Sequence, residues 1–307
     1  LRWRSAVGPV AGAPDEPPSV TADTGYAAPT VATDGKRVFA IFATGNVAGF
    51  DVEGERLWAR NLGVPENHYG HSSSLLVCGG LVYVQYDHFG GSELKALQAD
   101  SGTSAWETVR MADISWASPV LMEIRERMQL VLAAAPNVAA YDARSGEELW
   151  VTECLSGEVG PSPAVWEERV YIANQYAQAA ALKASDGTQI WTVDRIELPA
   201  AGSPIATAEH LFLPSPIGTF TCLSTDGGKT LWSHEFPQGG YASPILVGDL
   251  IYWMTSDGTC RIFRAQGAFE NVAAPSLGEK SMCTPAFVGD RIYARGDEHL
   301  FCIGEAK

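Results

Sequence analysis

The chain has 307 residues, of which 46% are hydrophobic and 19% are charged, and its formal net charge is −15. This composition allows a large buried core and excludes a disordered, coiled-coil or collagen-like protein. The acidic balance argues against nucleic acid as a partner, because nucleic-acid binding needs a basic surface. No apolar run approaches the roughly 18 residues of a membrane-spanning helix, so we expect no transmembrane segment.

The N-terminal region contains two different segments. Residues 1–6 include Trp3 and are expected to form a short strand, whereas residues 8–20 are rich in proline and alanine and predict an irregular loop. Proline interrupts regular structure because its ring fixes the backbone φ angle and its nitrogen has no hydrogen to donate. Repeated units are expected to begin after this loop.

Two sequence markers recur through the rest of the chain. A small residue followed by proline opens an apolar run at Ala28, Ser118, Ser162, Ser203, Ser243 and Thr284, with Ser73-Ser74 in that place once. A Gly-x-x-x-Trp pattern lies between these markers, with an Asp shortly before each Gly. Its tryptophans are 41 to 48 residues apart, and they are Trp58, Trp106, Trp150, Trp191 and Trp232.

Each unit is expected to contain four short strands. In the third unit they cover residues 119–122, 129–134, 138–142 and 147–150. The Asp and Gly between the last two strands predict a tight turn, since Asp bonds to the backbone there and Gly accepts a positive φ. The tryptophan then falls on the outer strand, where a large flat ring can fill the space between neighbouring sheets.

Seven units of about 44 residues account for the chain. Four-stranded units of this length are typical of a β-propeller. We therefore predict an all-β fold, a single seven-bladed β-propeller over residues 1–307. The last unit ends where its fourth strand should begin, so we expect residues 1–6 to supply the outer strand of the last blade and close the propeller. A lost upstream unit is the alternative origin of Trp3.

Two repeat copies, Val138–Trp150 and Thr221–Trp232, carry a resemblance to a known family. They resemble the quinoprotein-type repeat of pyrroloquinoline-quinone (PQQ) dehydrogenases and of BamB-like secreted bacterial proteins. This resemblance, together with Leu1 rather than Met as the first residue, leads us to expect a bacterial, extracytoplasmic protein, periplasmic or secreted.

The resemblance covers nearly the whole chain but does not specify a function. It implies that an enzyme of this family would have eight blades, a calcium ion held by acidic and amide side chains, a catalytic Asp and often a disulfide between adjacent cysteines. This chain has seven units and no Cys-Cys pair, and it lacks the G-x-S-x-G and H-E-x-x-H hydrolase motifs. We expect a non-catalytic protein without a cofactor, with a PQQ-dependent oxidoreductase or a carbohydrate-active enzyme as the alternative. No catalytic residue is assigned.

One set of equivalent positions is expected to surround the central channel of the predicted propeller. These positions lie three residues before each proline marker, and they are Tyr26, His71, Trp116, Gly160, Ala201, Tyr241 and Met282. Aromatic side chains, a histidine and a methionine together suit a ligand or peptide. The alternative is that large residues at these positions plug the channel. We predict that a protein or extended ligand binds at this face, and we expect the chain to be a monomer. The predicted binding residues are Tyr26, His68, Tyr69, His71, Trp116, Tyr241 and Met282.

The segment Asn67–His71 interrupts the second repeat. It carries two histidines three residues apart, and Asp87-His88 follow in the next turn of the same unit. Imidazole and carboxylate groups are metal ligands, but loop histidines more often make ordinary hydrogen bonds, so we predict no metal site. The six cysteines are far apart in the sequence and are expected to be mostly buried thiols.

Overall fold

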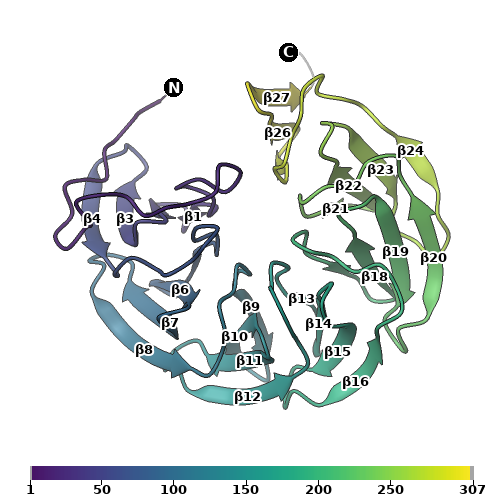
Figure 1. Cartoon of the computed structure of the whole chain (residues 1–307), viewed down its shortest axis with the longest axis horizontal. Helices are drawn as coiled ribbons and strands as arrows, with labels where there is room; N and C mark the ends of the chain where they lie inside the picture. The colour runs from purple at the N-terminus through teal and green to yellow at the C-terminus, as the bar shows by residue number, and fades with distance from the viewer. Residues whose placement is uncertain (1, 305–307) are drawn as a thin grey trace. The chain divides into compact units, whose positions relative to one another are not determined.

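The computed structural model describes residues 2–304, and every regular element within them is a β-strand (Figure 1). The strands form seven antiparallel sheets, six of four strands and one of three. The predicted all-β fold of seven propeller blades is therefore confirmed. The chain divides into two compact units, with the boundary between Val159 and Gly160.

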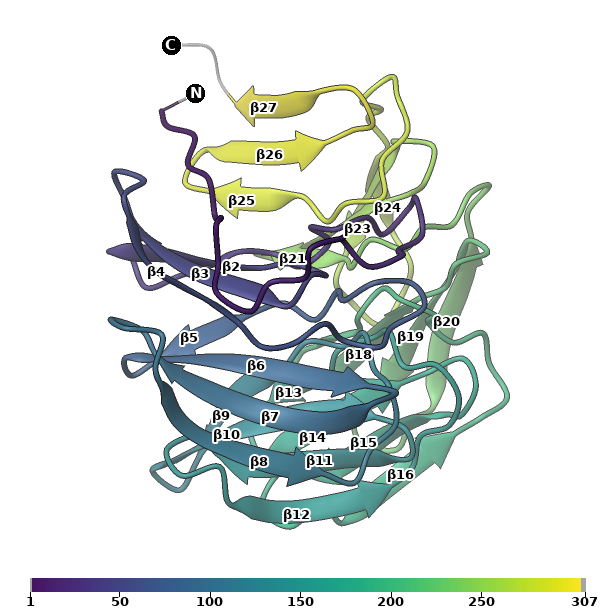
Figure 2. The same cartoon turned by 60° about the vertical axis from the view of Figure 1, so that its left-hand side comes forward.

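The first unit holds three sheets, whose strands follow one another in chain order. The first sheet is β1 (Ala32–Thr33), β2 (Arg37–Ile41), β3 (Asn46–Asp51) and β4 (Arg56–Asn61). The second sheet is β5 (Leu76–Cys78), β6 (Leu81–His88), β7 (Gly91–Gln98) and β8 (Ser104–Arg110). The third sheet is β9 (Val120–Ile124), β10 (Arg127–Ala134), β11 (Asn137–Asp142) and β12 (Glu148–Glu153). Figure 2 shows the long strands of the second sheet side by side.

The second unit holds the other four sheets in the same order. These are β13 (Ala164–Trp166), β14 (Arg169–Ala173), β15 (Ala179–Lys183) and β16 (Gln189–Val193); then β17 (Ile205–Ala206), β18 (His210–Pro214), β19 (Thr219–Ser224) and β20 (Thr230–Glu235). They continue as β21 (Ile245–Val247), β22 (Leu250–Met254), β23 (Cys260–Arg264) and β24 (Asn271–Ala273), and end with β25 (Ala286–Val288), β26 (Arg291–Arg295) and β27 (Leu300–Gly304).

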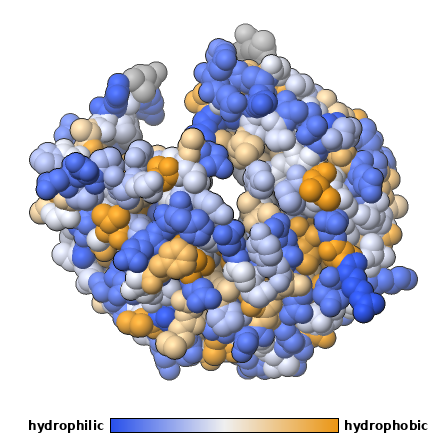
Figure 3. Space-filling model, viewed as in Figure 1, coloured by the Kyte–Doolittle hydropathy of each residue, from blue (hydrophilic) through white to orange (hydrophobic). Residues whose placement is uncertain are grey.

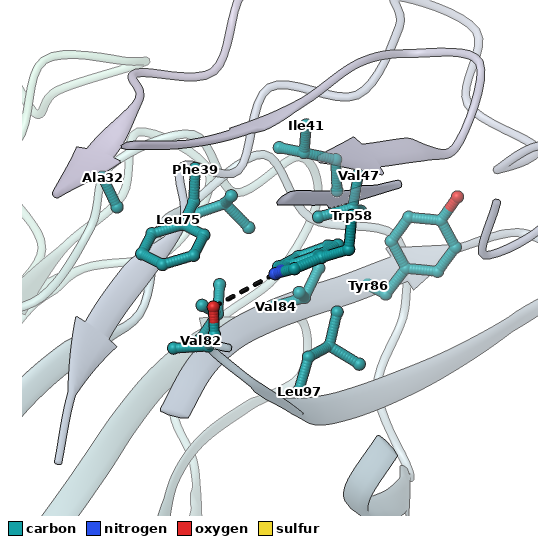
Figure 4. Packing of buried hydrophobic residues seen from close by; sticks show 11 residues of the cluster. Ala32, Phe39, Ile41, Val47, Trp58, Leu75, Val82, Val84, Tyr86 and Leu97 are labelled. Carbon is teal, nitrogen blue, oxygen red and sulfur yellow. Dashed lines mark hydrogen bonds between the residues drawn. The ribbon is translucent and has the colours of Figure 1, made fainter. Parts of the chain in front are cut away.

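Four tryptophans of the repeat lie on outer strands and pack between neighbouring sheets, as predicted: Trp58, Trp106, Trp191 and Trp232. Trp58, on β4, is 8% exposed and joins a core cluster that includes Phe39 of the first sheet and Val82 of the second (Figure 4). Its indole Nε1 donates a hydrogen bond to the carbonyl of Ala99, at 3.1 Å. The side chain thus joins two sheets by both apolar contact and a buried hydrogen bond.

The glycine of the repeat is needed for two reasons, of which the sequence indicated one. Gly102 has a φ of +68°, a backbone conformation that glycine adopts without steric cost. In addition, a Cβ at this position would lie 2.4 Å from the Trp58 ring of the preceding sheet. Gly146 stands in the same relation to Trp106. The pattern Gly-x-x-x-Trp therefore encodes a contact between successive sheets as well as a turn.

A hydroxyl group links the segments that lead into the inner strands of successive sheets. In the first unit, the Thr30 amide donates to Ser74 Oγ at 3.0 Å and the Ser74 amide donates to Ser118 Oγ at 2.9 Å. In the second unit the same link runs from Ser162 to Ser203, then to Ser243 and Thr284. The hydroxyl, rather than the proline, is thus the part of the marker that joins the sheets.

These hydrogen bonds correct the alignment of the first two sequence repeats. The sequence put Ser73-Ser74 and Ala28-Pro29 in the place of Ser118-Pro119, but the bonds put Ser74 and Thr30 in the place of Ser118. The equivalent positions therefore lie two residues later in the first repeat, where Thr30 replaces Ala28, and one residue later in the second repeat, where Ser74 replaces Ser73. His71 consequently corresponds to Ser115 rather than to Trp116.

The N-terminal segment packs on the first sheet. Trp3 stacks on Phe50 with the ring centroids 6.2 Å apart, donates from Nε1 to the Val52 carbonyl at 2.9 Å and covers Gly54. This repeats the relation of Trp58 to Gly102. Leu1 lies outside the described residues, and residues 2–6 have no assigned strand. The pairing of residues 1–6 with the last blade, and a single domain over residues 1–307, stay predictions.

Deletion of residues 1–6 is expected to lower the melting temperature, because it removes the stacked Trp3 and uncovers Gly54 and Phe50. Thermal unfolding followed by circular dichroism measures the effect. Substitution of Arg2 and Arg4 by alanine, with Trp3 kept, is the matched control. An unchanged melting temperature after the deletion would show that this segment stabilises neither the first sheet nor the last blade.

The cysteines are less buried than expected. All six are free thiols; Cys154 and Cys222 are buried, Cys78, Cys260 and Cys283 are partly buried and Cys302 is exposed. Cys302 lies on β27, which has a paired strand on one side only among residues 2–304.

Within this described part of the chain, no helix is long and apolar enough to cross a membrane.

Candidate functional site

Two loops and one hairpin of the first unit bring four aromatic side chains together, three of them exposed and one half-buried. His68 and Tyr69 lie in the loop before β5, Phe89 at the turn between β6 and β7, and Trp116 in the loop before β9. Glu158 lies in the last segment of the same unit, after β12. We call these five residues the aromatic–carboxylate cluster.

Asn67 shapes the loop that carries the two histidines. Its side-chain Oδ1 accepts hydrogen bonds from the amides of Tyr69 and Gly70, at 3.2 and 3.1 Å, and from Trp116 Nε1 at 3.0 Å. An Asn that caps its own loop in this way fixes a tight turn. Because the same oxygen holds the indole, the turn and the Trp116 ring are positioned together.

The aromatic rings of the cluster lie around His68. Ring centroids are 4.1 Å apart for His68 and Tyr69, 5.3 Å for His68 and Trp116, and 5.6 Å for His68 and Phe89, the last pair being stacked. Tyr69 and Trp116 are also in contact, at 5.2 Å. Such offset and edge-on pairs are favourable for aromatic rings.

The Glu158 carboxylate completes the cluster. Its Oε1 lies 3.3 Å from His68 Nε2 and accepts a hydrogen bond from the Tyr69 hydroxyl at 3.1 Å. Glu158 and His68 remain 44% and 42% exposed. The carboxylate therefore keeps lone pairs available to a further donor from solvent or from a ligand.

Phe89 gives this cluster an apolar edge. Its side chain is 64% exposed, and its amide donates to the Glu66 carbonyl at 3.0 Å, which holds the hairpin tip against the loop before β5. On the face drawn in Figure 3, hydrophobic residues are scattered among hydrophilic ones. Phe89 differs from such isolated residues because its ring stacks on the ring of His68.

His71, the other histidine of the loop, points elsewhere. It is only 1% exposed, and its ring contacts Tyr86 with centroids 5.3 Å apart. Burial lowers the pKa of His71 to about 4, and a backbone hydrogen bond with Ser73 opposes this shift only in part. At neutral pH the imidazole is uncharged inside the protein. The structure therefore separates His71 from His68 instead of bringing the two together at one site.

The depressed pKa of His71 makes stability fall in acid. The pKa of His71 in the folded protein lies below the ordinary value of 6.5. The contribution of the neutral His71 to the free energy of unfolding is therefore complete above pH 6.5 and is lost as the pH falls from 6.5 towards 4. The loss should reach about 3 kcal/mol. Urea unfolding of the wild type and of His71→Gln at both ends of this range isolates it, because carboxylates titrate equally in the two proteins. If the free energies of unfolding of the two proteins fall by the same amount between pH 6.5 and pH 4, His71 is not the source of the loss.

Asp87, which the sequence placed near the histidines, pairs with Arg110 instead. Its carboxylate forms an ion pair with Arg110, whose side chain is 1% exposed against 0% for that of Asp87. Gln85 Nε2 donates to the same carboxylate at 2.7 Å. Burial disfavours the charged Arg110, but the nearby Asp87 outweighs it and the pKa of Arg110 is raised. Asp87 thus belongs to a buried network of the second sheet.

The remaining predicted site residues stand apart from this cluster in the sequence. Tyr26, in the loop before β1, is exposed, and its carbonyl accepts a hydrogen bond from the Ala43 amide at 2.9 Å. In the second unit, Tyr241 and Met282 are exposed in the segments before β21 and β25. Their role in binding stays a prediction.

One group of possible metal ligands gathers in the described part of the chain, in the second unit. Glu279, Glu298 and His299 place ligand atoms within 4.8 Å of one another. The Glu279 carboxylate already accepts the amides of Glu298 and His299, and Glu298 and His299 are exposed. These residues do not form the enclosed acidic cage that the resemblance to PQQ enzymes requires, so no chemistry through PQQ is derived.

Sequence reasoning found His68, Tyr69 and Trp116 but missed Phe89 and Glu158. Phe89 follows β6 directly and precedes two glycines, and an apolar side chain at a glycine-rich turn is a signal for an exposed contact. Glu158 lies two residues before Gly160, one of the predicted equivalent positions. Nothing in its own segment indicates that it reaches His68, because that contact spans 90 residues.

Comparisons with known proteins agree with the fold described above. The family model described as outer membrane protein assembly factor BamB matches residues 1–118 and 134–307. No curated protein sequence matches the chain.

Several solved structures share the fold. The crystal structure of BamB from Moraxella catarrhalis is 18% identical, with a TM-score of 0.74, over 92% of this chain and 84% of that one. A europium-containing methanol dehydrogenase is 10% identical, with a TM-score of 0.71, over 86% and 72% of the two chains. The computationally designed Ika8 protein is 13% identical, with a TM-score of 0.66, over 88% and 81%. At these identities the similarity shows the fold alone.

Proposed function

We propose, from the premise that this chain belongs to the family of the outer membrane protein assembly factor BamB, that it is a non-catalytic propeller that binds a protein partner. The partner is an extended segment that lies on the aromatic–carboxylate cluster. The proposal extends to a bacterial, extracytoplasmic location, which the family description supports, and to a monomeric chain.

The observation that carries the proposal is the exposure of the cluster. Phe89 is 64% exposed and Tyr69 37%, although both lie next to other aromatic rings with which they could have been buried. Aromatic residues are enriched in protein interfaces because a rigid ring buries a large area at low entropic cost. Asn67 fixes the loop that holds Tyr69, and the Phe89 amide donates a hydrogen bond to the Glu66 carbonyl of that loop, so the surface is formed before a partner binds.

Site-specific photocrosslinking tests this proposal. A photoreactive phenylalanine at position 69 or 89 should capture one defined protein in cells that express the chain. The same probe at Val109 or Val151, exposed apolar positions on the outer strands β8 and β12, serves as the matched control. The captured protein is then purified, and its affinity should fall by at least about tenfold for Phe89→Ala.

Two results would contradict the proposal. One is equal capture of the same proteins at all four positions, which would mean that the cluster has no preference over other exposed apolar residues. The other is a purified partner whose affinity is the same for the wild type and Phe89→Ala.

A further inference from the structure

The loops that build the aromatic–carboxylate cluster carry acidic groups and no lysine or arginine. Within residues 62–75, 89–90, 111–119 and 154–159 the charged side chains are Glu66, Asp113 and Glu158, all at least partly exposed. The two basic side chains of the second sheet, Lys95 and Arg110, are paired with acidic residues of that sheet. No lysine or arginine of these loops or of this sheet is thus free to pair with Glu158, whose contact with a basic group there is the one with His68 Nε2, at 3.3 Å.

An aromatic surface next to a carboxylate that pairs with no lysine or arginine of its loops has a specific chemical preference. The faces of Trp and Tyr rings attract cations, by about 0.5 to 2 kcal/mol. A carboxylate with free lone pairs accepts two parallel N–H donors from a guanidinium. Arginine satisfies both at once, because its planar group stacks on rings while its edge donates to a carboxylate.

We infer that the cluster receives an arginine side chain of the bound segment, with the guanidinium against the rings of Tyr69 and Trp116 and its N–H groups on Glu158. This inference rests on the proposed function and names the chemistry of the partner. The net charge of −15 acts in the same direction, because an acidic protein attracts a basic segment from a distance.

The geometry of the cluster gives each residue a distinct part. Asn67 holds the indole of Trp116 through Nε1, so the ring cannot turn away from the site. Tyr69 donates its hydroxyl to Glu158 and orients the carboxylate. Phe89, the most exposed of the rings, contacts the neighbouring residue of the segment.

Nuclear magnetic resonance titration with short capped peptides tests the inference. The reporter is the indole N–H signal of Trp116, which is identified by its loss in Trp116→Phe. The probes are Gly-Ser-Arg-Ser-Gly, its lysine and citrulline analogues, and the neutral sugar maltotetraose. Citrulline has the shape of arginine without the charge and is therefore the matched control for the ligand.

The arginine peptide should shift the Trp116 signal saturably, and the citrulline peptide should not. Glu158→Gln should weaken arginine binding about tenfold, the loss of one charge-assisted hydrogen-bond pair. Glu123→Gln removes the same charge from an exposed position on β9 and should have no effect. Both Glu158 and Glu123 are at least partly exposed, so neither substitution is expected to impair folding.

Three results would overturn the inference: equal binding of the arginine and citrulline peptides, no saturable shift with arginine, or saturable binding of maltotetraose alone. The last would identify a sugar surface. Failure of the inference is distinguishable from failure of the proposed function. If crosslinking at position 89 still captures a partner whose affinity depends on Phe89, the binding function stands and only its arginine chemistry is wrong.

Discussion

Trp58→Ala is expected to lower the free energy of unfolding by about 3–5 kcal/mol, the usual cost of deleting a buried aromatic side chain. The indole lies between the first and second sheets, among Phe39 and Val82, and it covers Gly102. Its removal leaves a cavity between two sheets and takes the donor from the Ala99 carbonyl. Urea unfolding followed by tryptophan fluorescence and circular dichroism measures the change.

The neighbouring Leu57 provides a matched control on the same strand. Its side chain is 47% exposed, so Leu57→Ala should cost less than about 1 kcal/mol. Comparable losses for the two variants would mean that β4 as a whole, and not the Trp58 ring, stabilises the contact between the sheets.

Arg110→Met should destabilise the protein by about 3–5 kcal/mol, because it leaves the Asp87 carboxylate buried without its cation. The second oxygen of Asp87, Oδ1, is buried without a hydrogen-bond partner among the described residues, and Gln85 satisfies only Oδ2. The loss arises from desolvation of an unpaired charge. Equilibrium unfolding at neutral pH measures it.

The double variant Asp87→Leu, Arg110→Met separates the two parts of this effect. Removal of both charges should recover most of the stability lost in Arg110→Met, since replacing a buried ion pair with apolar residues is often neutral. Additive losses in the double-mutant cycle would show that the pair contributes through packing of each side chain rather than through its charges.

The fold was predictable because the repeat fixes its local chemistry many times over. Asp142 Oδ1 accepts the amides of Arg144 and Ser145, and the strands on either side of that turn lie within a few residues of their predicted ranges. Gly146 accepts a positive φ at the same turn. The sequence predicted that the tryptophan lies between neighbouring sheets, but not that Trp58 covers Gly102 of the next repeat, since spacing alone does not tell which residue a ring touches.

The candidate site was only partly predictable. Trp116 and Tyr69 were visible as aromatic residues in loops, but the burial of His71 depends on its packing against Tyr86. The contact of His68 with Glu158 joins loops 90 residues apart. Contacts of this kind follow from how successive sheets stack, and they have no local signature in one sequence.

The hydroxyl link between the segments that lead into the inner strands has a consequence for how such chains change in length. Ser74, Ser203 and Ser243 each use the amide towards the next sheet and the hydroxyl towards the previous one, so Ser203 accepts from Ser162 and donates to Ser243. The joint is head-to-tail and has the same bonding at each of these three residues. A duplicated segment of one repeat, inserted between Ser203 and Ser243, would bring its own donor and its own acceptor. The number of repeats can therefore change by gene duplication without any new bonding chemistry at the joints.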